Sequence, residues 1–144
     1  MKRPGLLSLG VIAAPTVQRG AFLEQRMKIT IFEAEEWERR ACQRLRPAHV
    51  VSCTAEALDA GSAETHGDAE IVSTFVNSRL RSDVLAKFPD LKLIATRSTG
   101  YDHIDRDWCA AHGVTIVNVP DYGDATVAEH AFALLLAVAR NLIE

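Results

Sequence analysis

The chain lacks the short motifs that identify a chemical site most directly. Its three cysteines, Cys42, Cys53 and Cys109, show neither a CxxC pair nor a set of Cys/His ligands at zinc spacing, which argues against a metal site and a disulfide framework. The sequence has no GxSxG elbow of a serine hydrolase and no GxGxxG loop that would hold a dinucleotide. Because free cysteines suit a reducing compartment, we expect a cytoplasmic protein without a bound metal.

The sequence also has no block of like charge. Its 16 Lys and Arg residues are offset by 19 Asp and Glu residues, which gives a formal net charge of −3. Without a basic patch we expect no nucleic-acid partner. No apolar run is long enough to span a bilayer, so we expect no membrane association. What is present, 144 residues of which 48% are hydrophobic, is enough for one globular domain with a core.

Residues 1–26 differ from the rest of the chain. Lys2 and Arg3 are followed by the apolar run LLSLGVIAA, which contains Gly10 and ends before Pro15. A short signal peptide has this organisation, but Met27 begins the strand-like segment MKITIF, which looks like a natural translation start. We therefore expect residues 1–26 to be a disordered N-terminal extension, with a cleaved signal peptide as the alternative.

From Met27 onward, strand-like and helix-like segments alternate. This alternation is typical of a parallel sheet whose strands are joined by crossover helices. The sequence predicts a flavodoxin-like α/β domain over residues 27–124, an open parallel sheet of about five strands with flanking helices. The predicted strands span 28–32, 49–53, 69–76, 92–96 and 114–119, and the predicted helices span 35–45, one turn within 55–68, 82–87 and 104–112.

The last segment, residues 125–144, has a different pattern. Large apolar side chains between 125 and 142 occupy almost the whole circumference of a helix rather than one stripe. Such a helix needs cover on every side. We expect a long C-terminal apolar helix that links to a further domain or pairs with a second copy of the chain, which predicts a homodimer or self-association.

In an open α/β sheet, ligands bind beyond the carboxyl ends of the strands, so the loops that leave the third, fourth and fifth predicted strands are the place to look for a site. In the first of these loops, backbone N–H groups beside Asn77 and Ser78 are suited to hold a carboxylate. The residues alone favour a plain helix-entry turn there.

The loop after the fourth predicted strand contains Ser98, Thr99 and Gly100, where a glycine lets the backbone approach a ligand. Asp102 and His103 follow shortly after. Ser98, Asp102 and His103 are too close in sequence to form a relayed catalytic triad. We expect Asp102 to cap the next helix and His103 to lie in its first turn.

The loop after the fifth predicted strand contains Tyr122, whose hydroxyl is suited to bind a carboxylate while its ring shields the site. Packing of that ring over the helix start explains the residue equally well. Glu129 and His130 are adjacent on the last helix and point about 100° apart, so we do not assign them as an acid–base pair.

Three stretches, FVNSxL, RSTGYDHID and NVPDYGDATVAEHAFALLL, together resemble the substrate-binding domain of the D-isomer-specific 2-hydroxyacid dehydrogenases, especially the D-lactate dehydrogenase branch. The resemblance covers residues 75–140. It implies an oxidoreductase that acts on the CH–OH group of a small 2-hydroxy or 2-keto acid with NAD. It also implies contacts to the substrate carboxylate from the backbone or side chains of Val76, Asn77, Ser98, Thr99, Gly100 and Tyr122, with Ser78 beside the nicotinamide.

In this family the catalytic arginine, glutamate and histidine and the GxGxxG loop all follow the VAEH helix, so none can be assigned here. We expect a chain truncated before its NAD-binding domain, inactive alone and unable to bind NAD. One alternative is a non-catalytic ligand-binding or regulatory module derived from the same domain. A response-regulator-like domain is a weaker alternative, because the first predicted strand ends in glutamates rather than in a phospho-acceptor aspartate.

Overall fold

The computed structural model describes residues 10–13, 26–120 and 123–142. The strands are β1 (Gly10–Ala13), β2 (Lys28–Ile31), β3 (Val50–Cys53), β4 (Ile71–Thr74), β5 (Leu93–Thr96) and β6 (Thr115–Asn118). The helices are α1 (Glu36–Cys42) with the 3₁₀ turn η1 (Gln43–Leu45), α2 (Ala60–His66), α3 (Ser82–Leu85), α4 (Arg106–Ala111) and α5 (Asp124–Ala139).

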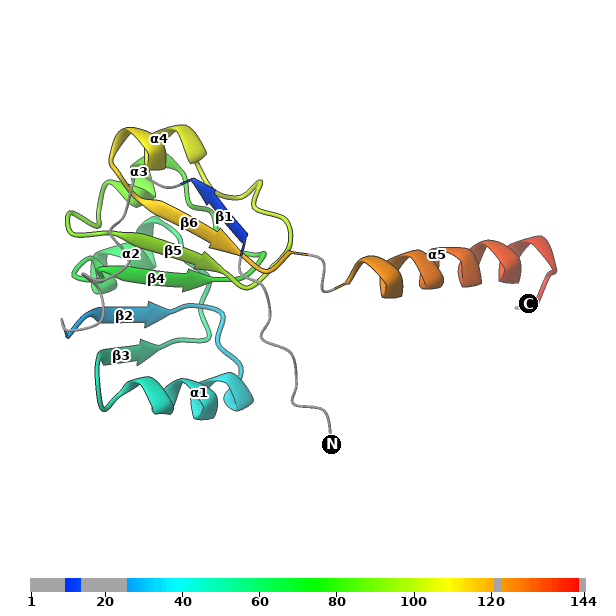
Figure 1. Ribbon diagram of the computed structural model, residues 1–144, viewed down its shortest axis with the longest axis horizontal. Coiled ribbons are helices and arrows are strands. Elements are labelled where there is room, and N and C mark those ends of the chain that lie inside the picture. Colours follow the sequence, from blue (N-terminus) through cyan, green and yellow to red (C-terminus); the bar gives the residue numbers. More distant parts are fainter. Residues whose placement is uncertain (1–9, 14–25, 121–122, 143–144) are drawn as a thin grey trace.

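The strands form one sheet in the order β1-β6-β5-β4-β2-β3 (Figure 1). The strands β2 to β6 pair in parallel, which confirms the predicted flavodoxin-like open sheet of five parallel strands. Strand β2 lies between β3 and β4, so the strand order reverses at β2. In sheets of this kind the ligand crevice lies outside the carboxyl ends of the strands at that reversal.

Each face of the sheet carries its own core. Alternate residues of the central strands are buried, and the neighbours Val72, Ile94 and Ile116 are fully buried in the larger cluster. Helices α2, α3 and α4 contribute side chains to that cluster. The smaller cluster on β2 and β3 includes Ile29 and Val51, and Cys42 of α1 packs against it. Burial on both faces fixes the register, because a slip of one residue would exchange the two faces.

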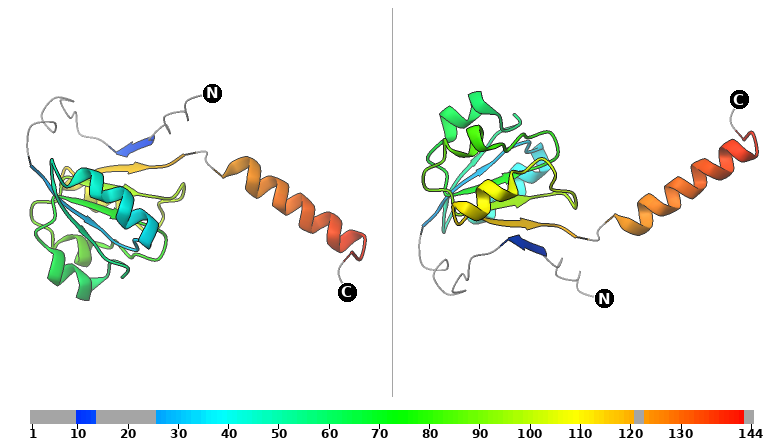
Figure 2. Two further views of the ribbon diagram at one scale, coloured as in Figure 1. Left: turned by 90° about the horizontal axis from the view of Figure 1, so that it is seen from below. Right: turned by 90° about the horizontal axis from the view of Figure 1, so that it is seen from above.

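Strand β1 corrects one expectation. Residues 1–26 were expected to be disordered, but Gly10–Ala13 pairs antiparallel with β6, with Gly10 opposite Asn118 and Val11 opposite Val117 (Figure 2). Without β1, the backbone N–H and C=O groups on the outer side of β6 would form an exposed sheet edge. An edge strand can pair through its backbone alone, so the sequence showed no alternating pattern there.

Two helix starts also differ from the expected ones. Helix α2 is longer than the single predicted turn, because Asp59 caps it by accepting from the N–H groups of Gly61 and Ser62. Helix α4 is capped by Asp105, which accepts from the Trp108 N–H at 2.9 Å, and not by Asp102. The backbone before Asp105 is pulled into a bridge with Leu80, whose N–H donates to the His103 carbonyl.

Helix α5 extends away from the sheet (Figures 1 and 2). None of its residues is buried, and the side chains of Phe132, Leu135 and Val138 are 66%, 61% and 77% exposed. This exposure agrees with the apolar pattern around the whole helix. No helix within the described ranges is both long and apolar enough to cross a membrane.

The pairing of β1 with β6 is testable by truncation. A chain that starts at Met27 loses β1, whereas a chain that lacks only residues 1–9 keeps it. If the pairing contributes about 1 kcal/mol, the first truncation lowers the melting temperature by roughly 4–8 °C, and the second leaves it unchanged. Circular dichroism melting curves of both truncations measure this difference, and equal melting temperatures would show that β1 contributes no stability.

Candidate functional site

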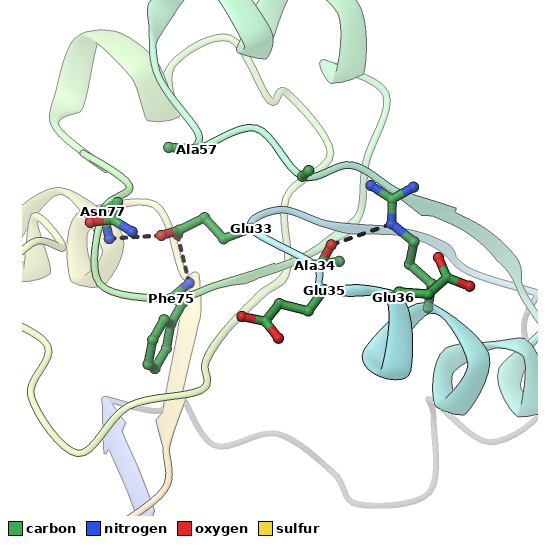
Figure 3. A pocket seen from close by; sticks show the side chains of 9 residues that line it. Glu33, Ala34, Glu35, Glu36, Ala57, Phe75 and Asn77 are labelled. Carbon is green, nitrogen blue, oxygen red and sulfur yellow. Dashed lines mark hydrogen bonds between the residues drawn. The ribbon is translucent and has the colours of Figure 1, made fainter.

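The candidate site lies at the carboxyl ends of β2, β4, β5 and β6. Two hollows open there. One, of about 740 Å³, is bordered by acidic side chains of the β2–α1 loop, together with Arg39, Phe75 and Asn77 (Figure 3). The other, of about 630 Å³, is lined by Trp37, Phe75 and Val119 and by the ion pair described below, and it shares Glu33, Glu35 and Phe75 with the first hollow. One acidic hollow and one more apolar hollow therefore lie at the same edge of the sheet.

Glu33, two residues after the end of β2, connects two of these loops. Its Oε2 accepts a hydrogen bond from the Phe75 N–H at 2.8 Å, and its Oε1 accepts from the Asn77 N–H at 2.7 Å (Figure 3). Its Oε2 also accepts from the Ser78 hydroxyl at 2.5 Å. The Ser78 hydroxyl oxygen in turn accepts from the Leu58 N–H at 2.9 Å. One carboxylate therefore ties the loop after β2 to the loop after β4.

The ionised form of Glu33 is the form that this arrangement favours. Burial alone would raise the pKa of its carboxyl group, but the hydrogen bonds from Ser78, Phe75 and Asn77 outweigh burial and hold that pKa below its usual range. At neutral pH the group carries a negative charge. The acidic hollow beside it therefore does not attract an anionic ligand.

Arg97, directly after β5, holds the backbone on which Glu33 sits. Its guanidinium group donates to the carbonyls of Phe32 and Glu33 at 2.9 and 3.0 Å and to the Ser73 hydroxyl at 3.0 Å. It also forms an ion pair with Glu38 at 2.8 Å, in which both side chains are mostly buried. The planar guanidinium group thus joins β5 to the loop that leaves β2.

The turn Ser98-Thr99-Gly100 follows Arg97 and is braced from both sides. The Ser98 hydroxyl donates to the Gly100 carbonyl at 2.6 Å, and the Thr99 hydroxyl donates to the Val119 carbonyl at 3.0 Å. The Asn118 side-chain amide donates to the Thr99 carbonyl at 2.9 Å. With the carbonyls satisfied in this way, the turn is held rigidly next to the end of β6.

Thr99 and Gly100 of this turn are exposed, whereas Ser98 is buried. Within the described part of the chain, the N–H groups of Ser98, Thr99 and Gly100 donate no hydrogen bond. A Cβ atom added at Gly100 would meet nothing within 4 Å, so space is available beside the turn. Open N–H groups beside free space are suited to receive a carboxylate.

The residues predicted from sequence fall into three groups. Ser98, Thr99 and Gly100 form the open turn, and Val76 is an exposed loop residue. Asn77 and Ser78 are engaged with Glu33, and Ser78 is fully buried, so contact with a nicotinamide ring would require this loop to open. Tyr122 lies outside the described residues.

Glu33 and Arg97 were not predicted as site residues. The signal that would have found them is their position, since each is a charged residue within two residues of the end of a buried parallel strand. His103 was expected in the first turn of α4, but it lies in the turn that precedes the Asp105 N-cap. His103 lies 3.4 Å from the Thr96 hydroxyl, and burial lowers the pKa of its ring, which favours the neutral form. Among the described residues, no group of His, Cys, Asp and Glu side chains is placed to hold a metal ion.

Known proteins resemble this chain in sequence. A 2-hydroxyacid dehydrogenase homolog of Schizosaccharomyces pombe is 32% identical over 121 residues, which cover 81% of this chain and 36% of the relative. A glyoxylate reductase of Thermococcus onnurineus is 39% identical over 113 residues, which cover 78% of this chain and 30% of the relative. The chain therefore spans about a third of the length of these curated relatives.

Solved structures and a family model agree with this similarity. The D-lactate dehydrogenase of Aquifex aeolicus, solved with NAD and lactic acid, matches with a TM-score of 0.67 and 30% identity over 76% of this chain and 33% of its own. The Escherichia coli enzyme of the same name matches with a TM-score of 0.63 and 26% identity over 81% of this chain and 38% of its own. The family model for the D-isomer specific 2-hydroxyacid dehydrogenase catalytic domain matches residues 28–141. The chain belongs to the D-isomer specific 2-hydroxyacid dehydrogenase family.

Proposed function

We propose that this chain is the substrate-binding part of an NAD-dependent D-2-hydroxyacid dehydrogenase that interconverts a small 2-keto acid and its 2-hydroxy acid. The observation that carries the proposal is the Ser98–Gly100 turn, whose open N–H groups lie at the carboxyl edge of the sheet in a chain of this family. The free state of all three cysteines suits the reducing cytoplasm.

The geometry gives the two ends of such a substrate different surroundings. The turn at Thr99 and Gly100 would receive the carboxylate, and the hollow lined by Trp37, Phe75 and Val119 would receive the substrate's side chain. The Thr99 hydroxyl bonds to the Val119 carbonyl, so the turn and this hollow are adjacent. We extend the carboxylate contact to Tyr122 from the family resemblance alone.

The residues described here do not fit a dinucleotide. The turn after β5 has one glycine where a pyrophosphate loop needs three, and Ser78, the residue expected beside the nicotinamide, is buried. In the reaction of a D-2-hydroxyacid dehydrogenase, NAD accepts or donates the hydride. We therefore propose that the 144-residue chain by itself neither binds NAD nor turns over substrate.

A non-catalytic ligand-binding module is the second candidate. The observation that favours it is the same lack of a GxGxxG loop in the 144 residues, together with a Ser98–Gly100 turn whose N–H groups donate to no described residue. The two candidates differ in the ligand that they recognise, because only a dehydrogenase part requires a 2-keto or 2-hydroxy acid. Binding of acids without that group would favour the second candidate.

The function is testable by titration of the ¹⁵N-labelled chain with pyruvate. We expect saturable shifts of the Ser98, Thr99 and Gly100 amide resonances, because a carboxylate accepts from those N–H groups, and no shifts with methyl pyruvate, which lacks the charge. The chain alone should oxidise no NADH in the presence of pyruvate. Absence of shifts in this turn, or measurable turnover by the purified chain, would contradict the proposal.

We further propose that α5 pairs with a second copy of the chain. Burial of a large apolar side chain contributes roughly 1.5–3 kcal/mol, and the helix exposes several of them in sequence: Leu134, Leu135, Leu136 and Val138. Self-association is the arrangement that covers this surface for a chain present on its own. Helix α5 follows β6 and extends from the carboxyl edge of the sheet, the edge that carries the candidate site (Figure 1).

Charge substitutions on α5 test this pairing. The double change Leu135→Lys and Leu136→Lys should shift the chain from dimer or larger species toward monomer in sedimentation velocity experiments, because it removes apolar surface and adds two positive charges. Glu129→Lys is the matched control, since it alters the net charge by the same two units on the same helix without removing apolar surface. A monomeric unmodified chain, or equal effects of both changes, would show that α5 does not mediate association.

A further inference from the structure

The hydrogen bonds of Glu33 are those that a bound ligand carboxylate would make. Two backbone N–H groups, of Phe75 and Asn77, and one hydroxyl group, of Ser78, converge on its two oxygens at 2.5–2.8 Å. Hydrogen bonds to an ionised carboxylate are short and about twice as strong as bonds between neutral groups. The loop after β4 is therefore a carboxylate-binding turn that the chain itself fills.

The backbone of Glu33 is held in the conformation that this contact needs. Its φ of 53° lies in the left-handed region, which is unfavourable for a residue with a side chain and persists only where surrounding contacts enforce it. Those contacts are present. The Glu33 N–H donates to the Glu56 carbonyl at 2.9 Å, and Arg97 donates to the Glu33 carbonyl.

Two N–H-bearing turns thus lie at the ends of the neighbouring strands β4 and β5. The turn after β4 contains a carboxylate of the chain, and acidic side chains, Glu35 and Glu36, line the same hollow. The turn after β5 has N–H groups that donate to no described residue, and space is free beside Gly100. A small anionic ligand that reaches this edge meets one filled turn in an acidic environment and one open turn.

We propose that Glu33 is a positioning residue that acts as an internal carboxylate: it closes the turn after β4 to the carboxylate of the substrate and so directs that group to the Ser98–Gly100 turn. The proposal rests on the proposed function for the nature of the substrate. It explains why a charged side chain occupies a site edge without contacting the ligand. In this proposal Asn77 and Ser78 bind the Glu33 carboxylate rather than the substrate.

The experiment uses the ¹⁵N-labelled 144-residue chain, with acetate as a carboxylate probe and sodium chloride at equal ionic strength as the reference. In the unmodified chain, acetate should leave the Phe75 and Asn77 amide resonances unshifted. In the Glu33→Ala variant, acetate should produce saturable shifts of both resonances and raise the melting temperature above its value in sodium chloride. Glu36→Ala is the matched control, because it removes one negative charge from the same hollow but no bond to the loop, and it should behave like the unmodified chain.

The outcomes separate this proposal from the function it rests on. If acetate shifts the Phe75 and Asn77 amides of the unmodified chain, or shifts neither in a folded Glu33→Ala variant, the proposal is overturned. If the Glu33→Ala variant does not fold even in acetate, the titration of the unmodified chain with pyruvate still tests the proposal. Pyruvate should then shift the Ser98–Gly100 amide resonances and leave those of Phe75 and Asn77 unshifted. Loss of all pyruvate shifts, with acetate still bound at Phe75 and Asn77 of the variant, would reject the substrate class and leave the role of Glu33 intact.

Discussion

One carboxylate with three hydrogen-bond donors holds the loops at the carboxyl edge of the sheet together. Glu33 accepts hydrogen bonds from the loop after β4, and Arg97 donates hydrogen bonds to the carbonyl groups of Phe32 and Glu33. A partly buried donor or acceptor that loses its partner costs roughly 1–3 kcal/mol. The positions of Phe75, at the border of both hollows, and of the loop behind it therefore depend on this pair of charged residues.

The order of the strands makes this contact possible. Strand β3 pairs with one side of β2, and β4 pairs with the other side. Glu33 therefore reaches the loop after β4, which follows it by more than 40 residues. The same order places the Ser98–Gly100 turn one strand further along, between that loop and the end of β6. The edge thus has an acidic half, centred on Glu33, and a half with open N–H groups. Under the proposed function, that asymmetry would give an anionic substrate one orientation.

Local patterns in the sequence were enough to predict most of the fold. Five parallel strands, the helices between them and the apolar circumference of α5 follow from side-chain periodicity, which depends only on neighbouring residues. The family was recognisable from the stretches around Asn77, Gly100 and Glu129. The N-cap of α4 was misplaced by three residues, at Asp102 instead of Asp105, because the bridge between Leu80 and Ile104 decides which aspartate caps the helix. The pairing of β1 was missed because an edge strand contacts its partner through the backbone, which carries no sequence pattern.

The sequence by itself determined the class of the sheet, the family and the positions of the turns at the carboxyl edge. Tertiary structure alone decided which of those turns is open. Asn77 and Gly100 look equivalent along the chain, since each follows a buried strand, but only Asn77 lies within reach of Glu33. Hydrogen bonds between residues far apart in sequence depend on strand order and on the backbone conformation at a single residue. Neither the strand order nor that backbone conformation can be inferred from local composition or periodicity.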